Sequence, residues 1–163
     1  MTITRFESKR LLYREICIDD AELIVRWRSD PLIYEGFRNA QPLTMERHLV
    51  WYNDRYVNDS TRVEYLIIYK QSNTPIGIIN VSDIQKRSLQ VGYLIGELSY
   101  QRQGFAAEAI NAVIDQYTSA GIVNYIAEIR SDNVASIRTV EKCGFVLEKE
   151  QESVFLRYIK VCK

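Results

Sequence analysis

The residues with the clearest chemical potential form a short polar segment near the middle of the chain. Gln101-Arg102-Gln103-Gly104-Phe105-Ala106 places a glycine just before apolar residues that recur at helical spacing. A helix start leaves backbone N–H groups unpaired and carries the positive end of the helix dipole. Such a turn can bind phosphate without a lysine, because Gly104 lets an anion approach the backbone and Ala106 keeps the second turn narrow. The plainer alternative is a turn that only joins two packed elements.

The other reactive side chains exclude several chemistries. His48 is the single histidine, and Cys17, Cys143 and Cys162 are widely separated. We therefore expect neither a structural zinc site nor any other bound metal, and a Ser-His-Asp hydrolase would depend entirely on His48. An odd number of separated cysteines fits a reducing cytoplasm without a disulfide framework.

Length and charge narrow the function classes further. The 163 residues fit a single domain over 1–163. Lys+Arg and Asp+Glu both count 21, which argues against a nucleic-acid partner held by bulk positive charge. No apolar run approaches the roughly 20 residues that span a membrane, and the charged N-terminus does not resemble a signal peptide. We expect a cytoplasmic protein without a membrane partner, either a monomer or a homodimer.

Periodicity predicts the elements that must position the polar segment. Leu89, Val91, Tyr93 and Ile95 alternate with other residues as in a strand, which leads directly into the segment. After the following helix, Ala120-Gly121 supplies a C-cap and 122–130 forms a strand. Because a helical crossover connects strands 89–95 and 122–130, they should be parallel. Further strands are expected at 9–16, 61–70, 76–84, 145–149 and 154–161, and helices at 21–28, 45–56 and 132–143. Pro31 should end the first helix, and 32–43 should be irregular.

A second motif lies beyond the strand at 122–130. It contains Asn133-x-x-Ser136 and, further on, Glu-Lys-x-Gly-Phe at 141–145. The Gln-x-x-Gly-x-Ala segment resembles the acyl-CoA pyrophosphate loop of the GCN5-related N-acetyltransferases, and this second stretch resembles their second acetyl-CoA motif. Two motifs in the expected order are far more specific than either alone. The resemblance implies an α+β fold with a mixed, mostly antiparallel sheet of about seven strands and a splayed parallel pair at the acetyl-CoA site.

The resemblance also implies which residues hold acetyl-CoA, the acyl donor. Residues from Gln101 to Ala106 would surround the pyrophosphate with backbone amides. Main-chain groups of Leu94, Ile95 and Gly96 would pair with pantetheine where strands 89–95 and 122–130 part. Asn133 would hydrogen-bond the pantetheine arm, with Ser136 nearby. Lys142 would reach the nucleotide phosphates, unless it simply faces solvent.

The chemistry implied is direct acetyl transfer to an amine in a ternary complex. Glu128 is the leading candidate for the base, because Glu-Ile-Arg matches the Glu-Val-Arg of ribosomal-protein acetyltransferases. An ordinary strand glutamate, paired with Arg130 or a lysine, is the alternative, and Glu64 and Glu35 are rival bases. The tyrosine that many relatives place in the second motif as proton donor is replaced here by Val140. Ser136, Tyr93, Cys143 or water would take over its role as proton donor, unless the thiolate leaves unassisted.

The segments before strand 61–70 are expected to close over the acceptor. Trp-Arg-Ser-Asp-Pro at 27–31 and Thr-x-Glu-x-His at 44–48 resemble acetyltransferases of the 4-amino group of nucleotide-linked amino sugars. Arginines there would meet a diphosphate, and an aromatic ring would meet a base. The expected acceptor contacts are Arg28, Glu35, Arg38, His48 and Trp51, with Arg47 and Tyr52 as further candidates. The alternative is that Trp27 belongs to the core and the arginines to the surface.

Two other functions stay open from the sequence. The first is a protein Nα-acetyltransferase resembling the ribosomal-protein group, which would need an open groove for a peptide. The second is a non-catalytic acyl-CoA-binding module, because the motif tyrosine is missing.

Overall fold

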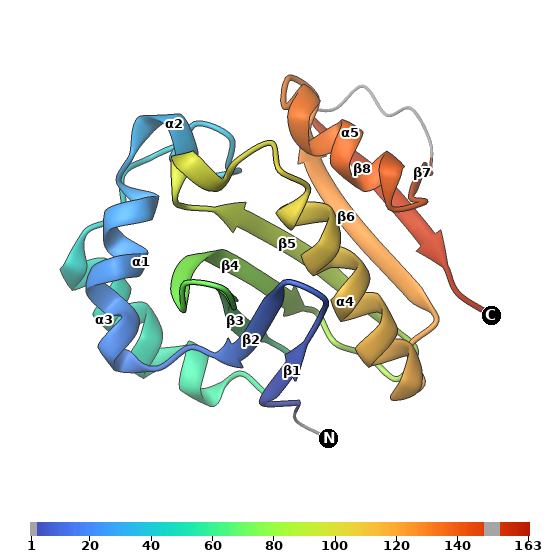
Figure 1. Ribbon diagram of the computed structural model, residues 1–163, viewed down its shortest axis with the longest axis horizontal. Helices are drawn as coiled ribbons and strands as arrows, with labels where there is room; N and C mark the ends of the chain where they lie inside the picture. The colour runs from blue at the N-terminus through green and yellow to red at the C-terminus, as the bar shows by residue number, and fades with distance from the viewer. Residues whose placement is uncertain (1–2, 149–153) are drawn as a thin grey trace.

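The computed structural model describes residues 3–148 and 154–163. It combines one sheet with helices on both of its faces (Figure 1). The strands are β1 (Arg5–Glu7), β2 (Leu11–Glu15), β3 (Val63–Tyr69), β4 (Thr74–Ser82), β5 (Ser88–Ile95), β6 (Asn124–Arg130), β7 (Val146–Leu147) and β8 (Phe155–Val161). The helices are α1 (Ala21–Arg28), α2 (Pro31–Tyr34), α3 (Met45–Asp54), α4 (Phe105–Ser119) and α5 (Val134–Lys142).

The sheet confirms the predicted fold class. Its order is β1-β2-β3-β4-β5-β6-β8-β7, and every neighbouring pair is antiparallel except β5 and β6. The parallel pair follows from the α4 crossover, as the sequence predicted. In the described part of the chain the sheet has eight strands where about seven were expected, because the short strand β1 was not predicted.

Strand alternation separates two apolar cores on opposite faces of the sheet. Tyr65 and Ile67 of β3 pack with α4, whose buried residues include Ala109 and Val113. Leu66 and its neighbours on the other face pack with α1, α2 and α3. Figure 1 shows α4 lying across the sheet while α1, α2 and α3 gather at the end away from β8. The sheet therefore separates two groups of helices that pack against its opposite faces.

One prediction near α2 is wrong. The sequence predicted that Pro31 ends a helix and that 32–43 is irregular, but Pro31 is the first residue of α2. Asp30 has extended backbone angles, and its carboxylate accepts the backbone N–H of Leu32, so Asp30 caps the helix. Proline suits a first helical position because its missing N–H would have no partner there. Helix α1 ends earlier, at Arg28, as predicted.

The predicted strand at 145–149 is only partly described. Strand β7 covers Val146–Leu147, and Lys149 lies outside the described residues. No helix in the described ranges is long and apolar enough to span a bilayer.

Candidate active site

The loop before α4 exposes a run of backbone N–H groups. Arg102 has a φ of 58° and Gly104, the N-cap of α4, has a φ of 80°. Within the described chain, no carbonyl or side chain accepts the N–H groups of residues 102–107. Left-handed residues alternating with right-handed ones turn successive N–H groups toward a common point, which suits an anion. The nearest heavy atom to an added Cβ at Gly104 would be Arg10 Nη2, at 3.6 Å, so glycine is required for its φ and not for lack of space.

Side chains hold this loop in place. Gln101 Nε2 donates to the Ile95 carbonyl at 3.0 Å, and Gln103 Nε2 donates to the Ser99 carbonyl at 2.6 Å. These bonds connect the loop to the end of β5 and to the short turn at 98–100 that precedes the loop. Gln101 and Gln103 therefore shape the loop with their side chains, which leaves the backbone amides for a ligand.

Arg10 and Glu108 brace the same loop and were not predicted from the sequence. Arg10 donates from Nε to Glu108 Oε2 at 2.6 Å and from Nη1 to the Gln103 carbonyl at 3.1 Å, and its guanidinium lies 4.1 Å from the Phe105 ring centre. Burial alone would raise the pKa of Glu108, but hydrogen bonds from Arg10 and Ser8 and the guanidinium charge outweigh it and lower that pKa. A charged pair thus fixes the loop from the β1–β2 turn.

Strands β5 and β6 part beside this loop and form a cleft. They pair only over Ser88–Gln90 and Asn124–Ile126 and then separate. The cleft has a volume of about 960 Å³ and runs from the α4 loop to the end of β6. Of the predicted cofactor contacts, it is lined by Leu94, Ile95, Gln101, Arg102, Gly104, Phe105, Ala106, Asn133, Ser136 and Lys142. Gly96 and Gln103 do not line it.

The register of β5 corrects the predicted main-chain contacts. The Gly96 N–H donates to the Ile76 carbonyl at 2.8 Å, so Gly96 and, two residues earlier, Leu94 direct their main-chain groups at β4. The groups that face the opening therefore belong to Tyr93 and Ile95. Glycine is required at position 96 for a different reason, because an added Cβ would lie 2.2 Å from the Trp27 ring. Trp27 is core, as the plainer alternative held.

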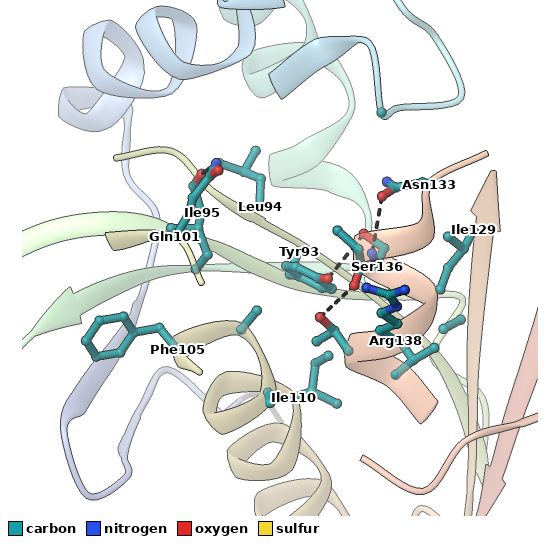
Figure 2. A pocket seen from close by; sticks show the side chains of 18 of the residues that line it. Tyr93, Leu94, Ile95, Gln101, Phe105, Ile110, Ile129, Asn133, Ser136 and Arg138 are labelled. Carbon is teal, nitrogen blue, oxygen red and sulfur yellow. Dashed lines mark hydrogen bonds between the residues drawn. The ribbon is translucent and has the colours of Figure 1, made fainter. Parts of the chain in front are cut away.

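Helix α5 presents a polar cluster to the cleft. Asn133 caps the helix through Oδ1, which accepts the Ser136 N–H at 3.2 Å. Tyr93 reaches across from β5 and donates from its hydroxyl to Ser136 Oγ at 3.2 Å (Figure 2). Burial raises the pKa of Tyr93 despite this bond. Val140, which replaces the motif tyrosine, is buried with 2% exposure.

The far end of the cleft carries Glu128, which has an unexpected partner. Arg38 Nη2 lies 2.5 Å from Glu128 Oε2, and its guanidinium lies 4.1 Å from the Phe155 ring centre. Arg130, the partner that the plainer alternative assigned to Glu128, instead pairs with Asp132 at 2.7 Å. Two residues with separately predicted roles, Glu128 as base and Arg38 as acceptor contact, are thus in contact.

The rival bases differ in position. Glu35 lines the cleft together with Glu128 and Asp132. Glu64 is buried on β3, pairs with Arg62 at 3.2 Å and does not line the cleft. The structure therefore brings Glu35, and not Glu64, to the same space as Glu128.

Five predicted acceptor contacts lie elsewhere. The residues that do not line the cleft are Arg28, His48 and Trp51, and the further candidates Arg47 and Tyr52. His48 is 2% exposed, lies 5.6 Å from the Trp51 ring and has no partner for Nε2 within the described residues. Burial first, and then the charge of Arg28, lower the pKa of His48. Arg28 lies 5.2 Å from the Phe37 ring centre. The sequence motif around these residues therefore builds the packing of α1 and α3.

Other cleft residues were missed. Arg138 lines the cleft with Arg102 and Lys142, and its spacing of four from Lys142 on a helix was the available sequence signal. Leu32 and Phe37 also line the cleft, on the same segment as Glu35, and nothing in their local sequence indicated this.

Comparisons with known proteins agree with this geometry. A family model described as an acetyltransferase (GNAT) domain matches residues 10–146. An uncharacterized protein of Methanocaldococcus jannaschii is 31% identical over 88% of this chain, and the chain spans 30% of that protein's length. The ribosomal-protein-serine acetyltransferase of Escherichia coli is 31% identical over 50% of this chain and 46% of its own length.

Solved structures share the fold. A domain from M. jannaschii matches with a TM-score of 0.84 and 28% identity, covering 95% of this chain and 100% of that domain. The spermidine N-acetyltransferase of Vibrio cholerae, solved with CoA and spermine, matches with a TM-score of 0.81 and 19% identity, covering 94% and 96% of the two chains.

Proposed function

Because the chain belongs to the acetyltransferase (GNAT) family, we propose that it transfers an acetyl group from acetyl-CoA to a primary amine by direct attack in a ternary complex. One observation carries the proposal: a single cleft connects a loop of unpartnered backbone amides to the carboxylate of Glu128. An anion site at one end and a base at the other are what a phosphate-bearing acyl donor and an amine require.

The residues present fit acetyl-CoA, which supplies the acetyl thioester when bound. The N–H groups of residues 102–107 would hold its diphosphate. Main-chain groups of Tyr93 and Ile95, on the open edge of β5, would pair with the amides of its pantetheine arm. Arg102, Arg138 and Lys142 line the cleft and would attract the nucleotide phosphates.

The side chains at the far end would carry the proton chemistry. Glu128 takes a proton from the attacking amine as the new C–N bond forms. The C–S bond breaks with its electron pair on sulfur, and the thiolate takes a proton from solvent. Glu128 is engaged by Arg38 in the structure, so an incoming amine must displace that guanidinium. The side chain of Arg38 is 64% exposed, and exposed ion pairs contribute only about 0–1 kcal/mol.

The acceptor end favours a positively charged amine. Three carboxylates, those of Glu35, Glu128 and Asp132, line it beside the apolar residues Leu32 and Phe37. Arg38 pairs with Glu128 and Arg130 with Asp132, so Glu35 is the one of the three that forms no ion pair within the described residues. A nucleotide-linked amino sugar would need arginines for its diphosphate, and Arg38 is the predicted arginine that lies at this end. We therefore propose a cationic acceptor, either a polyamine, as in the V. cholerae neighbour, or a protein N-terminus, as in the E. coli relative.

The test is an acceptor screen that measures CoA thiol release. The panel contains spermidine, a peptide with a free N-terminal serine, an aminoglycoside and a nucleotide-linked 4-amino sugar. We expect turnover with at least one of the cationic amines and an increase with their charge. Preference for the nucleotide sugar would overturn the proposed acceptor class, and CoA binding without transfer to any amine would overturn the enzymatic proposal.

A further inference from the structure

The hydrogen bond between Tyr93 and Ser136 constrains the serine hydroxyl. The Tyr93 hydroxyl donates to Ser136 Oγ at 3.2 Å, so one lone pair of that oxygen is occupied. Within the described residues Ser136 Oγ donates to no acceptor. The serine hydrogen is therefore directed away from Tyr93. Ser136 lines the cleft, so a donor without a partner is available there (Figure 2).

The surroundings make Tyr93 a permanent donor. Its hydroxyl lies between β5 and α5, and burial raises its pKa, so the phenol keeps its proton at neutral pH. Thr139, one turn along α5, uses its own hydroxyl to donate to the Ala135 carbonyl at 2.9 Å. Val140 at the motif position is apolar and buried, so it offers no hydroxyl of its own. Thr139 also lies within hydrogen-bonding reach of the Tyr93 hydroxyl, but its own hydrogen is engaged by the Ala135 carbonyl, so Ser136 is the hydroxyl here whose hydrogen has no acceptor within the described residues.

We propose that Tyr93 is a positioning residue that directs the Ser136 hydrogen at the sulfur of the acyl donor. Ser136 then donates a hydrogen bond to the sulfur, which stabilises the negative charge that develops as the C–S bond breaks. No proton leaves Tyr93 in this step. The inference rests on the proposed function, because it presumes a thioester in the cleft.

The first test measures binding and needs no turnover. We compare the affinity of the wild type for CoA and for desulfo-CoA, which lacks the thiol sulfur. The wild type should prefer CoA by roughly threefold to tenfold, the size of one neutral hydrogen bond. Ser136→Ala should abolish this preference, and Tyr93→Phe should reduce it most of the way. If Tyr93→Phe prefers CoA over desulfo-CoA as strongly as the wild type does, the proposal is overturned.

The second test is a double-mutant cycle on turnover. Ser136→Ala should lower kcat by up to roughly a hundredfold to a thousandfold, as loss of one donor to developing charge does. Tyr93→Phe should lower kcat by a similar or smaller factor without changing KM for acetyl-CoA. Because Tyr93 acts through Ser136, the double variant should be no slower than Ser136→Ala alone. Additive losses would overturn the positioning role.

Tyr125 provides a matched control. Its ring is fully buried and its hydroxyl donates to the Ile114 carbonyl at 3.0 Å, but it does not line the cleft. Tyr125→Phe should lower thermal stability while leaving kcat and the CoA preference unchanged. A loss of kcat in Tyr125→Phe equal to that in Tyr93→Phe would assign the effect to general packing. If the wild type transfers acetyl to no amine, the proposed function fails, while the CoA preference still decides the role of Tyr93.

Discussion

The two ends of the cleft are built by different means. The donor end, which is proposed to hold acetyl-CoA, is the loop before α4, and the conformations of Arg102 and Gly104 set its backbone. The acceptor end, which is proposed to hold the amine, is the part of the cleft around Glu128. The acceptor end is assembled from side chains on separate segments, and its central contact joins Arg38 to Glu128, 90 residues apart in sequence. The backbone conformation of the donor loop is therefore set locally and braced from a distance by Arg10, whereas the acceptor end exists only after the chain has folded.

Their energetics differ in the same way. The donor loop is held by several hydrogen bonds and by the Arg10–Glu108 pair, whose carboxylate is largely buried. Exposed groups hold the acceptor end, where the side chains of Arg38 and Glu128 are 64% and 30% exposed. The Arg10–Glu108 pair is therefore less weakened by solvent than the Arg38–Glu128 pair.

The largest expected effect comes from the acceptor end alone. Glu128→Gln should lower kcat by roughly 10²–10⁴ because the amine loses its base, while CoA affinity stays nearly intact. Steady-state rates and calorimetric CoA binding measure the two quantities. Glu64→Gln is the control, since Glu64 is a strand glutamate away from the cleft, and its rate should match the wild type. An unchanged rate in Glu128→Gln would reject the assignment.

The complementary change acts on the donor end alone. Gly104→Glu should weaken CoA binding by roughly a hundredfold or more, because it adds negative charge at the anion site and strains a residue with φ of 80°. Gly121 has a φ of 99° at the opposite end of α4 and open space around it. Gly121→Glu therefore carries a similar backbone strain, and calorimetry should show CoA affinity unchanged. Equal losses in both variants would mean that strain, and not the anion site, explains the result.

Acid should loosen the donor end through Glu108. Its pKa is lowered in the folded state, so its stabilising effect is present above its ordinary value of 4.5 and is lost as pH falls through the folded pKa. Thermal unfolding from pH 7 to pH 3 should show Glu108→Gln less stable than the wild type by on the order of 1 kcal/mol above pH 4.5, with the gap closing below it. A gap that stays constant across this range would contradict the role of the carboxylate charge.

The smallest effect concerns the tether of the acceptor end. Arg38→Ala should change the free energy of unfolding by less than about 1 kcal/mol, because the pair is exposed. It should also raise kcat/KM for a small amine a few-fold, since Glu128 no longer has to be released. Arg26→Ala is the matched control, because its pair with Glu97 has similar side-chain exposure, 62% and 26%, and neither residue lines the cleft. A loss of kcat/KM in Arg38→Ala would restore the expectation that Arg38 binds the acceptor.

The sequence by itself determined the fold class, the family resemblance and the donor loop. The donor loop follows from periodicity and from a glycine at a helix start, which depend on neighbours within a few residues. The family resemblance comes from the two motifs, and the fold class is what that resemblance implies. It also pointed to Glu128 and Ser136, whose places in the cleft the structure provides, while their catalytic roles stay predictions.

Only the tertiary structure decided which groups meet. The Arg10–Glu108 pair spans 98 positions in sequence, and the Tyr93–Ser136 bond spans 43. The register of β5 against β4 directs the main-chain groups of Gly96 at β4 and those of Tyr93 at the opening. A shift of one residue would reverse the direction of every main-chain group. The structure also decided that His48 is buried and that Trp51 packs against the core, because burial depends on partners that are distant in the sequence.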